Sequence, residues 1–487
     1  MKKITTFFAM LPLLLFGSNI QVTNVQVTPN TSTNEAVITF DLSWDNGWRI
    51  AGGTEFMDGA WVFIKYRTMA MPEWKHGFVS SSNIVSGILS YEADPRQLGV
   101  KFMPSVDTVG TINGSVGITI SNLLSTPYGL EVQVHAVEMV KIPSSPYYVG
   151  DYGDYSWHQY GSNNDEPYHI TQSDTIYRTQ GGIDHLNNSS VPYVVASTEE
   201  FWVMKYEVSQ DQFVSFLNSL SRTQQDNAVP LDLSTSSNNV FALSETATPS
   251  FRNGIRIDAG FDTVSGPLTF YCDLNNNSVA NENTDGLNIA CNYLSPDQLY
   301  GYLHWAGLQA MSEFDYEKCS RGPLFPNADE FAWGTSDIAP IDFTSSSMLQ
   351  NSGAPNETVQ VKMNYRAHLH TNTSSSFTGP IRCGALAESN TTTRIGASAS
   401  YYGLQDLTGN VGEYVLIQYG YAEILGVTFN PDTLNGEHGF NFNARDYSLV
   451  KGGSNIYALS STATVSICVS ATTNDIPVYM NGGRGRL

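Results

Sequence analysis

The first third of the chain is dominated by short segments in which apolar and polar residues alternate. Three such segments are Ile38–Trp44, Val116–Ile120 and Leu130–Val137, and Trp61–Tyr66 adds a mainly apolar run. Alternation with a period of two buries one face of each segment, and Gly- and Asn-containing turns separate the segments. A series of short strands of this kind is typical of two packed antiparallel sheets. The pattern predicts a β-sandwich over residues 19–134.

The extreme N-terminus has the organisation of a secretory signal peptide, residues 1–18. Lys2 and Lys3 precede a largely apolar stretch, and the small residues Gly17 and Ser18 follow it. Such a stretch is too short to span a bilayer. We therefore expect a secreted or cell-surface protein without a transmembrane segment, with the periplasm as an alternative compartment.

The charge balance excludes one large class of partner. The chain has 24 Lys and Arg against 46 Asp and Glu, a formal net charge of −22, and it contains no basic block. Proteins that bind nucleic acid need clustered cations to displace the counterions of the phosphates. We therefore expect no nucleic-acid partner.

Beyond residue 134 the sequence becomes rich in irregular polar segments, with a few helical patterns. Ser209 and Ser295 are each followed three residues later by Gln, the capping-box arrangement that begins a helix. A third helix is predicted to begin at Ser312 and to end before Gly322, because glycine is the common residue after a helix C-terminus. This part, residues 135–487, is predicted to be a second, loop-rich domain that folds without the first.

Six blocks of this second part occur in the order of a known family. They are Met139–Pro143 with Tyr148–Gly150, Phe201–Phe213, Trp305–Leu308 with Met311–Glu313 and Ser320–Gly322, Trp333–Gly334, Tyr402–Glu413, and Val450–Ser454. Together they resemble the formylglycine-generating enzyme (sulfatase-modifying factor) family, as found in secreted Bacteroidetes-type proteins. The resemblance implies a C-type-lectin-like domain, so the whole chain is expected to be α+β.

The resemblance also bears on catalysis. Active members of the family bind copper through two cysteines, which lie three and eight residues after the serine that matches Ser454. Here those positions are Tyr457 and Thr462, and neither supplies a thiolate for Cu(I). We therefore expect no copper and no catalytic residues, so the chain is interpreted as a pseudoenzyme.

A cation site is the family feature that the sequence keeps best. The resemblance implies side-chain oxygens from Asp406 and Glu413 and backbone carbonyls from Gly409 and Val411. Hard oxygen ligands of this kind suit Ca²⁺. A structural calcium ion is therefore predicted at this loop.

A second acidic loop carries a weaker calcium pattern. Oxygen side chains occupy alternate positions at Asp273, Asn275 and Asn277, as at the start of a calcium loop. The sixth position is Ser278 instead of Gly, and the twelfth is Thr284 instead of Glu. An Asx-rich turn is the competing interpretation.

The chain contains five cysteines, an odd number for an exported protein. Cys272 and Cys291 bracket one polar loop and are the disulfide candidate. On the chain-entropy model, closing that loop would contribute about 3 kcal/mol.

These observations favour a secreted, non-catalytic binding or adhesion protein. Its ligand would be a glycan, a peptide or a cell-surface protein, because lectin-type scaffolds hold recognition loops on a rigid frame. The alternatives are a metal-dependent oxidoreductase with an altered active site and a structural component of a cell-surface assembly. The predicted ligand groove consists of Asn455, Ile456, Tyr457, Ser460, Ser461 and Thr462.

Overall fold

The structure is a computed structural model, and it describes the following residues of the chain. These are 19–51, 55–123, 129–152, 166–179, 182–184, 192–233, 240–258, 266–340, 348–359, 366–369, 378–387, 393–416, 448–454, 464–466, 469–470 and 478–487.

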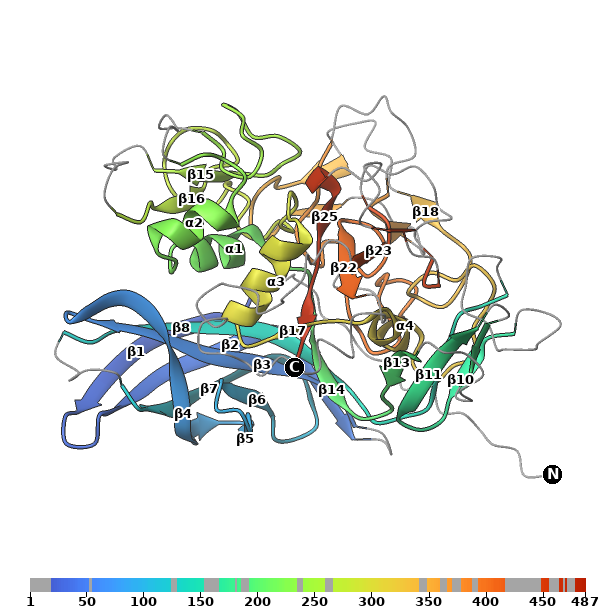
Figure 1. Ribbon diagram of the computed structural model, residues 1–487, viewed down its shortest axis with the longest axis horizontal. Helices are drawn as coiled ribbons and strands as arrows, with labels where there is room; N and C mark the ends of the chain where they lie inside the picture. Colours follow the sequence, from blue (N-terminus) through green and yellow to red (C-terminus); the bar gives the residue numbers. More distant parts are fainter. Residues whose placement is uncertain are drawn as a thin grey trace.

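Long antiparallel strands make up the N-terminal part, as the alternating pattern predicts (Figure 1). Ile38 and Leu42 of one strand are fully buried, and they share one apolar core with Val62, Ile64 and Ile118 of two others. The strands are β1 (Gln21–Asn30), β2 (Glu35–Ala51), β3 (Glu55–Thr68), β4 (Met71–Gly87), β5 (Leu89–Ala93), β6 (Val100–Pro104), β7 (Thr108–Ser121) and β8 (Glu131–Ile142).

The N-terminal sheet continues without interruption into the second part of the chain. Its strand order is β1-β2-β7-β4-β3-β8-β14-β26-β17, in which β14 (Phe201–Met204), β26 (Gly485–Arg486) and β17 (Gln309–Ala310) come from beyond residue 134. The predicted boundary between residues 134 and 135 lies inside β8, which pairs with β3 and with β14. Independent folding of the two parts stays a prediction. Cutting the chain between residues 134 and 135 would divide β8 and disrupt its pairing with β3 and β14.

Four helices are described, and each begins with a serine capping box: α1 (Gln210–Leu217), α2 (Arg222–Ala228), α3 (Pro296–Trp305) and α4 (Glu313–Arg321). The predicted caps Ser209 and Ser295 are confirmed, because each hydroxyl accepts the N3 amide proton and each N3 Gln reaches back. The third predicted helix is also confirmed, with Ser312 as its N-cap. It ends at Gly322, whose φ of 63° is the left-handed conformation that glycine favours.

Helix α3 packs on the N-terminal sheet and joins the two parts in one apolar core (Figure 1). The indole Nε1 of Trp61, on β3, donates to the carbonyl of Ala306 at 2.8 Å. Phe63 meets the edge of Trp305, with ring centroids 5.1 Å apart, and Phe216 of α1 contacts the same indole at 5.6 Å. Side chains from both sides of the predicted boundary therefore bury one another in a shared apolar core.

A buried ion cluster reinforces this junction. Lys205 follows β14, and its Nζ lies 2.9 Å from Asp58 Oδ2 and 3.2 Å from Glu138 Oε2. The same amine donates to the carbonyl of Asn46 at 3.0 Å and lies 4.6 Å from the ring centroid of Trp48. A cation from the second part thus pairs with one carboxylate on β3 and one on β8.

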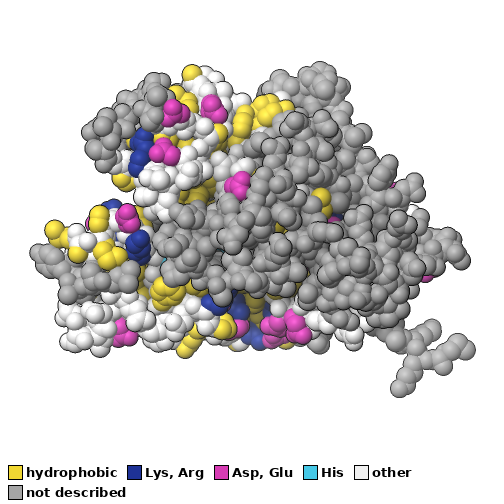
Figure 2. All heavy atoms as spheres, in the orientation of Figure 1, with side chains coloured by type: hydrophobic (Ala, Val, Ile, Leu, Met, Phe, Trp, Pro, Cys, Tyr) yellow, Lys and Arg dark blue, Asp and Glu magenta, His cyan; other side chains and the backbone are white. Residues whose placement is uncertain are grey.

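The remaining elements are short and form small sheets around loops. They are β9 (Tyr147–Val149), β10 (Tyr168–Ile170), β11 (Asp174–Thr179), β12 (Gly182–Asp184), β13 (Pro192–Ala196), β15 (Ile255–Ile257), β16 (Phe270–Cys272), β18 (Ala339–Pro340), β19 (Leu349–Gln350), β20 (Thr358–Val359), β21 (Arg366–Ala367), β22 (Gly412–Leu416), β23 (Ser448–Lys451), β24 (Val469–Ser470), η6 (Val478–Met480) and β25 (Asn481–Gly482). The lobe with β15 and β16 lies above the N-terminal sheet, and acidic side chains gather on its visible face (Figures 1 and 2). The fold is therefore α+β and rich in strands. None of the described helices is long and apolar enough to cross a membrane.

Candidate functional site

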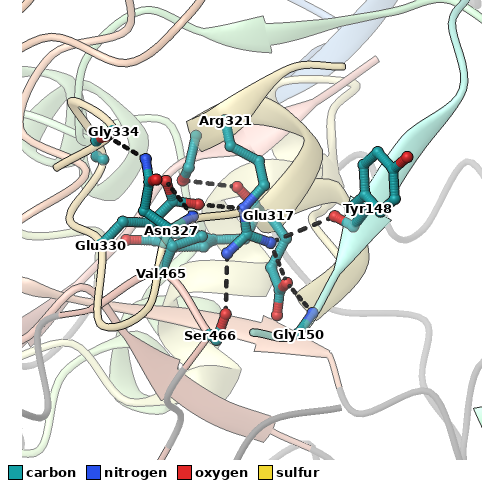
Figure 3. A network of polar contacts seen from close by, with 12 residues as sticks. Tyr148, Gly150, Glu317, Arg321, Asn327, Glu330, Gly334, Val465 and Ser466 are labelled. Atoms are coloured by element: carbon teal, nitrogen blue, oxygen red, sulfur yellow. Dashed lines mark hydrogen bonds and ion pairs between the residues drawn. The ribbon is translucent and has the colours of Figure 1, made fainter. Parts of the chain in front are cut away.

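A network of buried charges lies between α4 and β9 (Figure 3). Glu317 and Arg321 are one helical turn apart on α4, and Arg321 Nη1 contacts Glu317 Oε2 at 2.6 Å. Arg321 also donates from Nε to Glu330 Oε1 at 2.5 Å and from Nη2 to Ser466 Oγ at 2.9 Å. Lys451 Nζ reaches the other oxygen of Glu317 at 3.0 Å. The negative charges of Glu317 and Glu330 are thus balanced by the positive charges of Arg321 and Lys451 in the interior.

This network fixes the position of β9. The backbone N–H of Gly150 donates to Glu317 Oε2 at 2.7 Å, and Arg321 Nη1 donates to the carbonyl of Tyr148 at 3.3 Å. Burial raises the pKa of Glu317, but the charges of Lys451 and Arg321 lower it, and the net shift is downward. Glu317 is therefore a charged, fully bonded anchor for the strand and its turn.

Above this support lies a cluster of partly exposed rings, which we call the aromatic patch: Tyr148, Tyr152, His169 and Phe325. Tyr148 and His169 are cross-strand partners on β9 and β10, and their rings stack with centroids 4.1 Å apart and planes at 7°. Phe325 meets Tyr148 edge-on at 5.1 Å and lies 6.1 Å from Tyr152. Phe325 is 52% exposed and Tyr152 is 44% exposed. The rings thus form a continuous surface held from below.

Single exposed apolar residues are ordinary, but adjoining ones commonly mark a site of interaction. Sequence reasoning missed this patch because its members come from separate segments: β9 and the residues after it, β10, and the chain beyond α4. The one available signal was the position of Tyr148 in one of the blocks on which the predicted family resemblance rests.

The two carboxylates of the predicted calcium loop already have protein partners. The Asp406 carboxylate accepts the backbone N–H of Gly384. Glu413 forms a two-point ion pair with Arg484, with Nε 2.9 Å from Oε2 and Nη2 2.6 Å from Oε1, and both residues are fully buried. Gly409, with φ of 88°, donates its N–H to a backbone carbonyl after β23 at 2.8 Å. Calcium at this loop stays a prediction, and the ion would compete with Arg484 for Glu413.

A third buried carboxylate, Glu207, belongs to the same region and was not anticipated. Its Oε1 accepts the backbone N–H of Val411 at 3.0 Å, and its Oε2 accepts Asn410 Nδ2 at 2.6 Å. Burial raises the pKa of Glu207 well above its ordinary value, and the charges of Asp406 and Glu413 raise it further. Among the described residues, no three His, Cys, Asp or Glu side chains are arranged as a ready metal site.

The predicted ligand groove lies outside the described residues, in full: Asn455, Ile456, Tyr457, Ser460, Ser461 and Thr462.

The predicted disulfide is not present in the structure. Cys272, at the end of β16, and Cys291 are both buried free thiols within the core that α1 and α3 share. The Cys291 Sγ donates to the carbonyl of Asn292 at 3.8 Å. Burial raises the pKa of both cysteines well above the ordinary value, so both remain in the thiol form. The two residues behave as small apolar core side chains.

Comparison with known proteins does not assign the chain to a family. No family model matches the chain, and no curated protein matches it. One similar solved structure comes from work on pH-induced modulation of Streptococcus parasanguinis adhesion by Fap1 fimbriae. It has 11% sequence identity, covers 35% of this chain and 86% of its own, and has a TM-score of 0.14. Another is the group B streptococcus pilus 2b backbone protein, with 9% identity, 37% and 78% coverage and a TM-score of 0.12. At these TM-scores neither likeness carries an argument about function.

Proposed function

We propose that the chain is a secreted, non-catalytic binding or adhesion protein, with a β-sandwich followed by a formylglycine-generating-enzyme-like domain. The sequence resemblance supports the scaffold, and Tyr457 and Thr462 at the expected copper positions support the absence of oxidase chemistry. The ligand is a glycan, a peptide or a cell-surface protein.

The observation that carries this proposal is the aromatic patch on its charged support. Aromatic side chains supply much of the binding energy at recognition surfaces, because they bury a large area at little cost in conformational entropy. Tyr148 and His169 are fixed by strand pairing, and the Arg321 network holds β9 from below. A ligand therefore meets rings that are already ordered, which reduces the entropy lost on binding.

The proposal is tested with the mature chain, by which we mean residues 19–487 without the predicted signal peptide. This chain is screened against arrays of glycans and peptides, and the affinity of the best ligand is then measured. Phe325→Ala should weaken binding by about tenfold or more if it is an anchor of the site. Tyr91→Ala is the matched control, because Tyr91 is an aromatic residue of similar exposure on β5, at 45% against 52% for Phe325. Equal affinities of the two variants would remove the patch from the site.

Two other outcomes favour the alternative functions. Reversible self-association of the mature chain at micromolar concentration would favour a structural component of a cell-surface assembly. Stoichiometric copper or iron in the purified protein would favour a metal-dependent oxidoreductase.

A further inference from the structure

The loop after β16 returns to its own starting point. It runs from Asp273 to Asp285, and the N–H of Leu274 donates to the carbonyl of Asp285 at 3.3 Å. Farther along, the N–H of Asn281 donates to the carbonyl of Cys272 at 3.2 Å. The carboxylates of Asp273 and Asp285, which are twelve positions apart in the sequence, are thereby brought to one place with both residues fully buried.

Asp273 is fully engaged by protein groups. Its Oδ2 pairs with Arg256 Nη1, and its Oδ1 accepts the backbone N–H of Asn277 at 3.0 Å. Glu282 Oε2 accepts the side-chain amides of Asn275, at 3.3 Å, and of Asn277. These bonds order the loop but leave one group unexplained.

That group is Asp285 Oδ1. The other oxygen, Oδ2, accepts the backbone N–H of Glu282 at 2.6 Å, whereas Oδ1 is buried and has no hydrogen-bond partner in the described structure. A buried carboxylate oxygen without a partner is rare, and an ion is one of its standard explanations. Burial raises the pKa of Asp285, the backbone N–H groups of Glu282 and Asn275 lower it, and the charges of Asp273 and Glu282 raise it, so that the net shift is upward. Three carboxylates face one guanidinium here, so the loop has a local charge of about −2 and lacks a cation.

We propose that this loop binds one Ca²⁺ ion, with Asp285 as its charged anchor and oxygens of Glu282, Asn275 and Asn277 as further ligands. The ligand set is entirely oxygen, from carboxylates and amides, which suits Ca²⁺ better than a transition metal. The Oδ1 atoms of Asn275 and Asn277 each accept one backbone N–H, at 3.0 and 2.8 Å, and each keeps a second lone pair for the ion. Because amide oxygens take part, the site does not need three converging carboxylates.

The proposal also explains the acidic side chains over β15 and β16 in Figure 2, which attract cations to this lobe. The ion would hold together the segments of the loop that carry Asn275 and Asp285, and so would order one edge of the lobe.

The test uses the mature full-length chain, stripped with chelator and titrated with CaCl₂ by calorimetry and by thermal unfolding. Wild type should bind an ion at this loop and unfold at a higher temperature with calcium. Asp285→Asn keeps the shape of the side chain, removes one charge, and should weaken calcium binding by about tenfold or more. Glu282→Gln lies at the more exposed rim of the loop, and it should weaken binding without threatening the fold.

Two controls separate this loop from other sites. Asp258→Asn removes an exposed carboxylate next to β15 in the same lobe and should bind like wild type. Glu413→Gln removes the carboxylate of the other predicted calcium loop and should leave this ion in place. The inference is overturned if wild type shows neither binding heat nor a thermal shift, or if both loop variants bind like wild type. It is also overturned if Glu413→Gln alone abolishes binding.

Discussion

Replacing Lys205 by Met should destabilise the protein more than any change to an exposed ion pair. Lys205 and its partners Asp58 and Glu138 are each at most 1% exposed, so the change leaves two carboxylates in the interior without their cation. Breaking a buried pair from one side costs about 3–5 kcal/mol, because the remaining charge has lost both water and partner. The matched control is Lys101→Met, whose partner Glu92 is 54% exposed, and it should cost about 1 kcal/mol or less.

The mature chain is unfolded with urea, and unfolding is monitored by tryptophan fluorescence. With a slope of about 3 kcal/mol per molar, the Lys205→Met midpoint should fall by about 1 M or more. Combining Lys205→Met with Asp58→Asn and Glu138→Gln removes the stranded charges, and it should recover much of the loss. The reasoning fails if Lys205→Met costs no more than Lys101→Met, or if the triple variant is no more stable than the single one.

The effect of pH on this variant has a definite sign. Burial raises the pKa values of Asp58 and Glu138 in the folded protein, and Lys205 opposes that rise. Without Lys205 the two folded-state pKa values rise further above their unfolded values. Stability of the variant is then gained as pH falls, since the folded state binds more protons. The stability deficit of Lys205→Met relative to wild type should therefore narrow as pH is lowered through the raised folded-state pKa values toward the ordinary carboxyl values.

Two further predictions concern smaller features. Glu207→Gln removes a carboxyl whose pKa in the folded protein is raised by burial. The free energy of unfolding of wild type should therefore increase relative to that of the variant as pH is lowered through this pKa toward 4.5. Parallel plots of stability against pH for the two proteins would contradict this. Ser295→Ala removes the N-cap of α3 and should lower the free energy of chemical unfolding by about 1 kcal/mol, whereas Ser295→Asn should lower it much less. Equal decreases for the two variants would contradict the capping role.

Much of the local structure could be predicted from the sequence. Period-two alternation predicted the strands β2, β7 and β8, an apolar run predicted β3, and serine caps predicted the starts of three helices. These signals lie within a few neighbouring residues, so chain stereochemistry fixes them before any long-range contact forms.

The candidate sites needed contacts between distant segments. Neither Tyr148 nor Phe325 stands out locally, and they become one surface only because α4 packs against β9. In the same way, the family resemblance predicts Glu413 as a cation ligand, while its pairing with Arg484, 71 positions away, could be seen only in the fold.

The domain division shows the same limit. The sequence by itself determined that a strand-rich part is followed by a loop-rich part, because composition and periodicity change near residue 135. Only the tertiary structure decided that β8 crosses that point, and that Trp61 bonds to Ala306 across 245 positions. Periodicity reports which face of a segment is buried, whereas the identity of the buried partner depends on how the whole chain excludes water from one shared core.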